Sequence, residues 1–192
     1  VRFKELLVSP NEMKQKFIRL INEEIKNKQA GKPAYILIKI NHITDPVMVK
    51  KLYEASSHGV RIDLLVRGNC SLITGVPGVS DAIRINGIID RYLEHSRIFI
   101  FANGGDEKMF IGSADWMPRN LDNRVEVIAP VYDPEIKADL KRVVEYGLKD
   151  TLQGRVVDGT GENRPWISED KTAFRSQEEL YKYYLNENRI KD

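Results

Sequence analysis

The amino-terminal part of the chain alternates between continuous apolar runs and segments in which apolar residues recur at helical spacing. Residues 34–40 and 60–66 are apolar almost throughout, a pattern typical of strands that are covered on both faces of a sheet. Helical spacing predicts helices from residue 10 to about residue 30 and over 46–57. The apolar positions concerned are Met13, Phe17, Leu20, Ile21 and Ile25 in the first segment and Val49, Leu52 and Tyr53 in the second. With a short strand at 6–8, this order predicts a β-α-β-α-β arrangement and a largely parallel sheet.

Short polar signals mark the starts of the predicted helices. Ser9-Pro10-Asn11-Glu12 has the form of a capping box with proline at the first helical position, and Ser176 with Glu179 has the same spacing. Asp45-Pro46 and Asp133-Pro134 place an N-cap aspartate directly before a proline. We therefore expect helices to begin at these four places.

The middle of the chain predicts a β-hairpin. Two apolar runs, 98–101 and 109–111, flank Asn103-Gly104-Gly105, which supplies residues that adopt the positive φ angles of tight turns. A hairpin centred between Gly104 and Gly105 places His95 opposite Ala114, within reach of Ser113 and Asp115. An imidazole, a hydroxyl and a carboxylate would then meet at the open end of the hairpin. The alternative is that His95 is a structural histidine, held at a strand end by a neighbouring carboxylate.

The carboxy-terminal part adds further elements. Alternation over 124–128 predicts a strand, and helical spacing predicts a helix from Pro134 to about Asp150. Residues 153–171 are rich in Gly, Asn and Asp and predict a loop around one short strand at 155–157, before a last helix over 177–188. Residues 83–89 fit neither pattern clearly. The fold class predicted is α/β, with a mixed, largely parallel sheet flanked by helices and a central hairpin.

Three arginines lie at predicted strand ends. Arg67 ends one strand, Arg97 precedes the first hairpin strand and Arg124 opens another, so all three could surround the loops at 69–80 and 116–123. Guanidinium groups bind phosphate oxygens in a bidentate way and keep their charge near neutral pH, so such a group of arginines suits an anionic substrate. The alternative is simple ion pairing. The candidate pairs are Arg67 with Asp63, and Arg124 with Asp122 or Glu126.

Composition excludes several classes of protein. The 30 basic and 28 acidic residues nearly cancel, which argues against a dedicated nucleic-acid binder. Cys70 is the only cysteine, so no internal disulfide forms and a reducing compartment is expected. No apolar run approaches the roughly 20 residues that span a bilayer, and we expect a soluble, cytoplasmic protein. The sequence has no P-loop motif, and no histidine or cysteine spacing typical of a zinc site, so no metal-ligating residue is predicted. The start at Val1, without Met, suggests a piece of a longer protein.

The motifs resemble two related families. His95-Ser-Arg97 followed by Gly112-Ser113-Ala-Asp115 resembles the phospholipase D type motif, with Arg in place of Lys and Asp in place of Asn. Over nearly the whole chain, a larger set of strings is similar to the C-terminal part of the bacterial polyphosphate kinase family. These strings are Leu65-Val-Arg67-Gly, Gly75-Val-Pro77-Gly, Arg91-Tyr-Leu-Glu-His95-Ser-Arg97, Asn103-Gly-Gly-Asp106, Ser113-Ala-Asp-Trp116-Met and Arg119-Asn-Leu-Asp122.

The resemblance to polyphosphate kinases implies a function and a mechanism. It implies an enzyme that moves the terminal phosphate of ATP reversibly onto polyphosphate, with magnesium as cofactor and through a phosphohistidine. The active site would lie between two phospholipase D-like halves, and this chain resembles the second. Arg67 and Arg124 would bind phosphates of the nucleotide or polymer. His95 would be a catalytic histidine that acts as general acid or base and also contacts phosphate, with Arg97, Ser113 and Asp115 in support.

The same resemblance implies partners and a domain organisation. The partners are ATP or ADP, inorganic polyphosphate and the first half of the same polypeptide, with a homo-oligomer at full length and no nucleic acid. The phosphorylated histidine would lie in that first half, so the fragment alone is expected to be inactive. Residues 1–152 would form the phospholipase D-like domain, and residues 153–192 a loop and helix that dock on it.

Two other functions fit the residues. Phospholipase D-like nucleases with a single motif complete their site by dimerising, so the chain could be a phosphodiesterase with His95 as nucleophile. Arg97 and Asp115 depart from that motif and count against this function. A non-catalytic module that binds anionic polymers would depend on Arg67 and not on His95.

Overall fold

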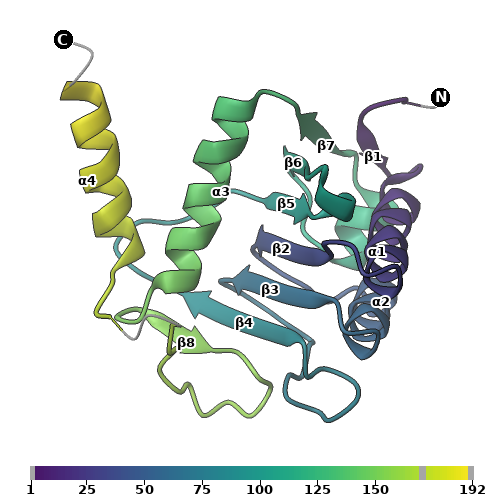
Figure 1. The fold of residues 1–192 in the computed structure, drawn as a ribbon, viewed down its shortest axis with the longest axis horizontal. Coiled ribbons are helices and arrows are strands. Elements are labelled where there is room, and N and C mark those ends of the chain that lie inside the picture. Colours follow the sequence, from purple (N-terminus) through teal and green to yellow (C-terminus); the bar gives the residue numbers. More distant parts are fainter. Residues whose placement is uncertain (1–2, 169–171, 190–192) are drawn as a thin grey trace.

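The computed structural model describes residues 3–168 and 172–189 and contains one sheet with helices on both faces (Figure 1). The strands are β1 (Leu7–Ser9), β2 (Tyr35–Ile40), β3 (Arg61–Val66), β4 (Ile83–Ile88), β5 (Ile98–Phe101), β6 (Lys108–Gly112), β7 (Glu126–Val131) and β8 (Gly154–Val156). The helices are α1 (Met13–Gln29), α2 (Pro46–Ser57), α3 (Pro134–Lys149) and α4 (Ser176–Arg189). Short helical turns cover Asn103–Gly105 and Arg119–Asn123.

The sheet is mixed. Its strand order is β1-β7-β6-β5-β2-β3-β4-β8. The predicted α/β class, with a mixed sheet flanked by helices and a central hairpin, is confirmed. Its parallel part is smaller than predicted, because only the β2–β3 and β3–β4 pairs are parallel whereas the other five neighbouring pairs are antiparallel. The β5–β6 hairpin is antiparallel because its short turn leaves no room for the long crossover that a parallel pair needs, while β1, β5 and β8 add to the sheet antiparallel to β7, β2 and β4.

Helices cover the two faces of the sheet unequally (Figure 1). Helices α1 and α2 pack on one face through Phe17, Ile21 and Leu52, which are fully buried in the larger apolar core. Helix α3 covers the other face, where Val144 packs with Leu37, Leu65 and Ile100. Helix α4 lies outside α3 and contacts it through Tyr184, whose hydroxyl donates to Asp139 Oδ1 at 2.9 Å. Within the described residues, no helix is long and apolar enough to cross a membrane.

The hairpin register is confirmed. Ile98 pairs with Ile111 and Phe99 with Phe110, which centres the hairpin between Gly104 and Gly105. Asn103 and Gly104 adopt φ angles of 48° and 71°, the left-handed region that Asn and Gly tolerate best.

Three of the four predicted helix starts are confirmed, two of them with the predicted cap. Asp45 accepts hydrogen bonds from the backbone N–H groups of Val47 and Met48, and Asp133 caps α3 in the same way. The capping box at Ser9 is wrong, because α1 begins at Met13 and Ser9 Oγ contacts the carbonyl oxygens of Asn120 and Arg124 instead. Helix α4 begins at Ser176 as predicted, but the Ser176 hydroxyl donates to Asp150 Oδ2 at 2.7 Å, which differs from the predicted capping box. Both hydroxyls donate to residues far away in the sequence instead of capping the helix that follows them.

The carboxy-terminal segment adds to the same sheet. Strand β8 pairs antiparallel with β4, which occupies the segment that the sequence left unassigned. The predicted strand at 155–157 lies one residue earlier, at Gly154–Val156. Part of the predicted loop, residues 169–171, lies outside the described residues. The division of the chain at residue 152 stays a prediction.

Candidate functional site

Five strands end or begin at one edge of the sheet, and each is followed or preceded by polar residues. Strands β2, β3 and β6 finish there, and β5 and β7 begin there, because β5 and β7 run antiparallel to their neighbours. The polar residues next to these strand ends are Asn41 and His42 after β2, Arg67 after β3, His95 and Arg97 before β5, Ser113 and Asp115 after β6, and Arg124 before β7. The edge therefore gathers side chains that are far apart in the sequence.

These side chains line one cavity of about 480 Å³. Its lining residues are Asn41, His42, Arg67, His95, Arg97, Ser113, Asp115, Arg119, Asn120, Arg124 and Glu126. The structure thus brings every predicted site residue to the same place, while their roles stay predictions. A larger cavity of about 590 Å³ lies at the opposite edge, beside Asn103 and Lys108, but no histidine lines it.

Arg67 contacts His95 directly. Its Nη2 lies 2.9 Å from His95 Nδ1, and its Nε donates to Asn41 Oδ1 at 2.5 Å. A guanidinium can only donate, so Nδ1 accepts, and a neutral imidazole bonded in this way carries its proton on Nε2. The expected alternative partner, Asp63, pairs instead with Arg61 and Arg84. Arg67 is therefore not engaged by the carboxylate nearest to it in sequence.

Arg97 and Asp115 form an enclosed ion pair. Arg97 donates to both carboxylate oxygens at 3.2 and 3.0 Å, and the backbone N–H groups of Asn41 and His42 donate to the same carboxylate. Burial alone would raise the pKa of Asp115, but the bonds from Arg97 and from the two backbone groups hold this pKa below its usual value. Most of the Arg97 charge is thereby compensated inside the protein.

The expected grouping of His95 with Ser113 and Asp115 is only partly correct. All three line the cavity, but Asp115 binds Arg97, and Ser113 bonds to Glu126 and to the backbone of Val127. The reason is that β5 begins at Ile98, so the cross-strand pairing stops before it reaches His95. His95 therefore faces Arg67, which follows β3 two strands away from β5, rather than the hairpin carboxylate.

The backbone of Arg124 is fixed by hydrogen bonds, while its guanidinium group has no carboxylate partner among the described residues. Its carbonyl oxygen lies 2.6 Å from Ser9 Oγ, and its N–H donates to the carbonyl of Arg119. Among residues 3–168 and 172–189, no carboxylate pairs with this guanidinium. The two expected partners are engaged elsewhere, since Asp122 pairs with Lys14, and Glu126 accepts bonds from Ser113 and Asn120.

Sequence reasoning assigned no role to Arg119, which also lines the cavity. Its signal was the Arg119-Asn-Leu-Asp122 string, which forms the short turn before β7. With Arg67, Arg97 and Arg124 it makes four guanidinium groups against the two carboxylates of Asp115 and Glu126. The cavity is therefore positively charged and suits a polyanion.

The described residues do not gather a metal site. No group of three or more His, Cys, Asp or Glu side chains lies close enough together within them to hold an ion. The two carboxylates of the cavity are already engaged, Asp115 by Arg97 and Glu126 by Ser113 and Asn120. The cavity side chains in the described part of the chain therefore do not fit a protein-held magnesium ion.

Comparison with known proteins gives a consistent family. The family described as polyphosphate kinase C-terminal domain 2 matches residues 6–177. A polyphosphate kinase of Vibrio vulnificus (strain YJ016) is 42% identical over 186 residues, which cover 97% of this chain and 27% of that protein. The crystal structure of the polyphosphate kinase from Porphyromonas gingivalis superposes with a TM-score of 0.93 at 40% identity, covering 98% of this chain and 29% of that one. This chain thus spans about a quarter of the length of such relatives.

A more distant likeness concerns the fold alone. Nuc of Salmonella typhimurium, a phospholipase D family member, superposes with a TM-score of 0.55 at 14% identity, over 81% of this chain and 97% of its own. The phospholipase D-like fold expected from the sequence is confirmed.

Proposed function

This chain belongs to the polyphosphate kinase family, as its C-terminal domain 2, and from that premise we propose that it supplies the cationic part of a phosphoryl-transfer site. The whole enzyme would transfer the terminal phosphate of ATP reversibly to polyphosphate. The phosphohistidine would lie in another part of the longer polypeptide, so this chain alone would not transfer phosphate. The observation that carries the proposal is the single cavity in which Arg67, His95 and Arg124 meet.

The arginines would position the phosphates. Phosphoryl transfer passes through a loose transition state, so positioning and charge stabilisation are the main contributions of the protein. Arg67 and Arg124 have no carboxylate partner among the described residues, and each can therefore direct its guanidinium to phosphate oxygens. Arg97 is less suited to this task because Asp115 compensates its charge.

His95 would handle the proton or the hydrogen bond at the bridging oxygen. While Arg67 donates to Nδ1, the neutral ring can offer only its Nε2–H as a hydrogen bond. To donate a proton from Nε2, the ring must first bind a second proton from solvent at Nδ1, and this requires Arg67 to turn away beforehand. A phosphate that binds Arg67 would release Nδ1 in this way, which couples substrate binding to the acid function of His95.

Magnesium has no step on this chain in the proposal. Because the cavity carboxylates are engaged, a magnesium ion in the reaction would be held by phosphate oxygens and by groups outside the described residues. A cytoplasmic location and assembly of the full-length protein as a homo-oligomer belong to the same proposal. The single cysteine supports the location.

The test is substitution in the full-length polypeptide that carries this domain. We expect His95→Ala to lower kcat for ATP-dependent polyphosphate synthesis about 10²- to 10⁴-fold, the range of a lost general acid or base. Arg67→Ala and Arg124→Ala should each lower kcat/KM about 10- to 150-fold, as expected for a lost charged hydrogen bond. Arg19→Ala is the matched control, because Arg19 is exposed and lies on α1, outside this cavity. Wild-type turnover in all three cavity variants would refute the proposal.

A second assay separates the nuclease-like alternative. The 192-residue chain is incubated with radiolabelled ATP and, separately, with a phosphodiester, and its size in solution is measured. We expect no acid-labile phosphoprotein and no diester hydrolysis. A stable dimer that hydrolyses the diester and depends on His95 would favour a phosphodiesterase instead.

A further inference from the structure

The segment that carries His95 has little secondary structure of its own. Residues 90–96 connect β4 to β5, and no backbone-to-backbone hydrogen bond among the described residues reaches them. Tyr92 and Leu93 are 58% and 77% exposed, so apolar packing does not fix the segment either. Its position must therefore come from side-chain contacts.

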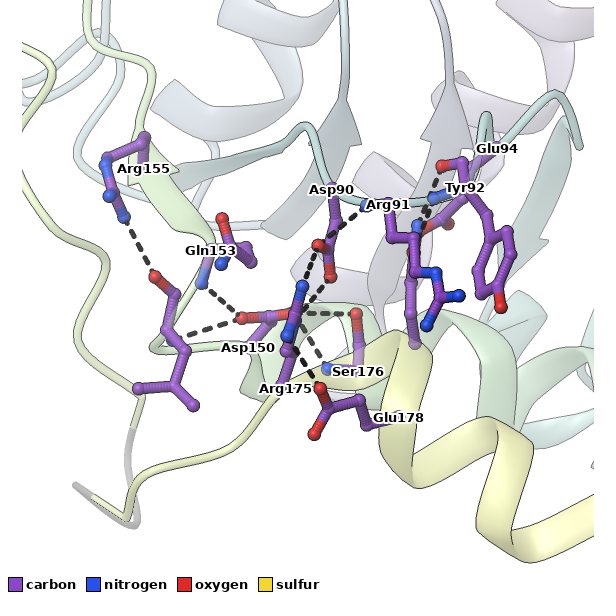
Figure 2. Close-up of polar contacts among 12 residues, drawn as sticks. Asp90, Arg91, Tyr92, Glu94, Asp150, Gln153, Arg155, Arg175, Ser176 and Glu178 are labelled. Carbon is purple, nitrogen blue, oxygen red and sulfur yellow. Dashed lines mark hydrogen bonds and ion pairs between the residues drawn. The ribbon is translucent and has the colours of Figure 1, made fainter.

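Two of the side chains that hold this segment come from the first turn of α4 and from the residue before it. Figure 2 shows the second of them, Arg175, bonded to Asp90. Arg175 donates to both carboxylate oxygens of Asp90, at 2.9 and 2.6 Å, and Asp90 also accepts from the N–H of Arg91. The bond from Arg175 lowers the pKa of Asp90, whose side chain is only 3% exposed. The amino end of the segment is thus fixed to the residue that precedes α4.

Gln177, in the first turn of α4, makes three further bonds to the segment. Its Oε1 accepts from the N–H of Tyr92 at 2.9 Å, and its Nε2 lies 2.8 Å from the Tyr92 carbonyl and 2.9 Å from Glu94 Oε1. One side chain therefore satisfies both backbone groups of Tyr92 and orients Glu94. Gln177 is itself 9% exposed, which limits competition from water.

The contacts continue from Glu94 into the candidate site. Glu94 pairs with Lys39 at 2.8 Å, and Lys39 lies on β2 with its side chain 8% exposed. The next residue, His95, bonds to Arg67. Gln177 thus contacts Glu94, and Glu94 is joined directly to His95, whose imidazole bonds to Arg67.

The start of α4 is itself fixed to the body of the domain by Asp150, at the end of α3 (Figure 2). Asp150 is fully buried, and its Oδ2 accepts from the N–H and the hydroxyl of Ser176 at 2.8 and 2.7 Å. Its Oδ1 accepts from the N–H groups of Leu152 and Gln153. The first turn of α4 is therefore bonded to the end of α3 through a buried carboxylate.

We propose that Gln177 is a positioning residue for His95. It acts by holding the Tyr92–Glu94 backbone in place, so that His95 keeps its position against Arg67 in the cavity. The inference rests on the function proposed above, and it assigns to the carboxy-terminal helix a part in catalysis although α4 does not line the cavity.

The test uses Gln177→Met in the full-length polypeptide, because methionine keeps the length and the apolar stem but loses all three hydrogen bonds. We expect kcat to fall about tenfold, since a small displacement of a reacting group has an effect of this order or larger. Amide hydrogen exchange over residues 92–96 should accelerate, while that of β2 and β3 stays unchanged. The control is Tyr184→Phe, which removes a bond between α4 and α3 but none to the segment. It should change neither kcat nor exchange at 92–96.

Two outcomes would refute the inference, and a third would refute only the proposed function. Wild-type kcat and exchange in Gln177→Met would refute it, as would equal losses in Gln177→Met and Tyr184→Phe, which indicate general destabilisation only. If His95→Ala keeps wild-type turnover, the proposed function fails. Faster exchange at 92–96 in Gln177→Met would then still support the positioning of the segment by Gln177.

Discussion

At the scale of single residues, the ion pair between Arg97 and Asp115 decides which charges of the cavity remain available. Both side chains are at least nine-tenths buried, with exposures of 10% and 6%, and the carboxylate also accepts from two backbone N–H groups. Breaking such a pair leaves an unpaired buried charge, which costs far more than the net stabilisation of the pair itself. Asp115 therefore links the end of β6 to the start of β5 through Arg97, and to the end of β2 through the two backbone groups.

We expect Asp115→Asn to lower the free energy of unfolding of the 192-residue chain by about 3 kcal/mol at pH 7. The folded-state pKa of Asp115 lies below its usual value of 3.8, so this carboxylate stabilises the fold above that pH. Its contribution is lost as the pH falls through the lower, folded-state pKa. Urea unfolding from pH 7 to pH 2.5 should show the gap between wild type and variant narrowing in acid. A gap that stays constant with pH would contradict this account.

At the scale of elements, the helix starts show which local signals survive in the folded chain. Asp45 and Asp133 each use Oδ1 to cap a helix that begins with proline, and Lys14, a distant partner of Asp45, pairs with its other oxygen, Oδ2. Ser9 and Ser176 carry the same kind of signal, but both are buried and donate to groups far away in the sequence. An N-cap side chain thus bonds to its own helix when it is exposed, as Asp133 is. It also does so when a second oxygen can take the distant partner, as in Asp45.

Helix α3 offers a clean measurement of one cap. Asp133 is exposed, and among the described residues its carboxylate accepts only from the backbone N–H groups of Glu135 and Ile136. Asp133→Ala should lower the free energy of unfolding by about 1 kcal/mol, the usual effect of a lost N-cap. Asp133→Asn, an equally good cap, should stay within a few tenths of a kcal/mol of wild type. Chemical denaturation of the three proteins checks both values. Equal losses in the two variants would show that charge rather than capping matters.

At the scale of the whole molecule, the ends of five neighbouring strands form one positively charged edge of the sheet. Four guanidinium groups line its cavity, and one of them is compensated by Asp115. Because the strands are fixed by the two apolar cores, the arginines are held in place before any ligand arrives. Such preorganisation lowers the entropic cost of binding.

Inorganic tripolyphosphate should therefore stabilise the isolated chain. At a hundredfold excess over Kd, the expected gain is about 2.7 kcal/mol, measured as a rise in Tm. The combined variant Arg67→Ala/Arg124→Ala should lose most of this rise, and added salt should reduce it in wild type. Arg19→Ala is again the control and should respond like wild type. A Tm that rises equally in the double variant would place the anion elsewhere.

The sequence by itself determined the features that depend on local spacing. The fold class, the two aspartate caps and the hairpin register follow from apolar periodicity and from Asn103-Gly104-Gly105, because these signals act between near neighbours. The positions of Arg67, His95 and Arg124 at strand ends were readable for the same reason. The motif strings also gave the family correctly.

Only the tertiary structure decided which groups meet. Residues 83–88 become a strand because β3 and β8 pair with them, although their own pattern is ambiguous. His95 meets Arg67 rather than Asp115, and Gln177 meets Tyr92, across separations of 28 and 85 residues. Such contacts depend on strand order and helix packing, which leave no periodic trace in the sequence. The chemistry of the site was therefore encoded by residue type, and its connections by the fold.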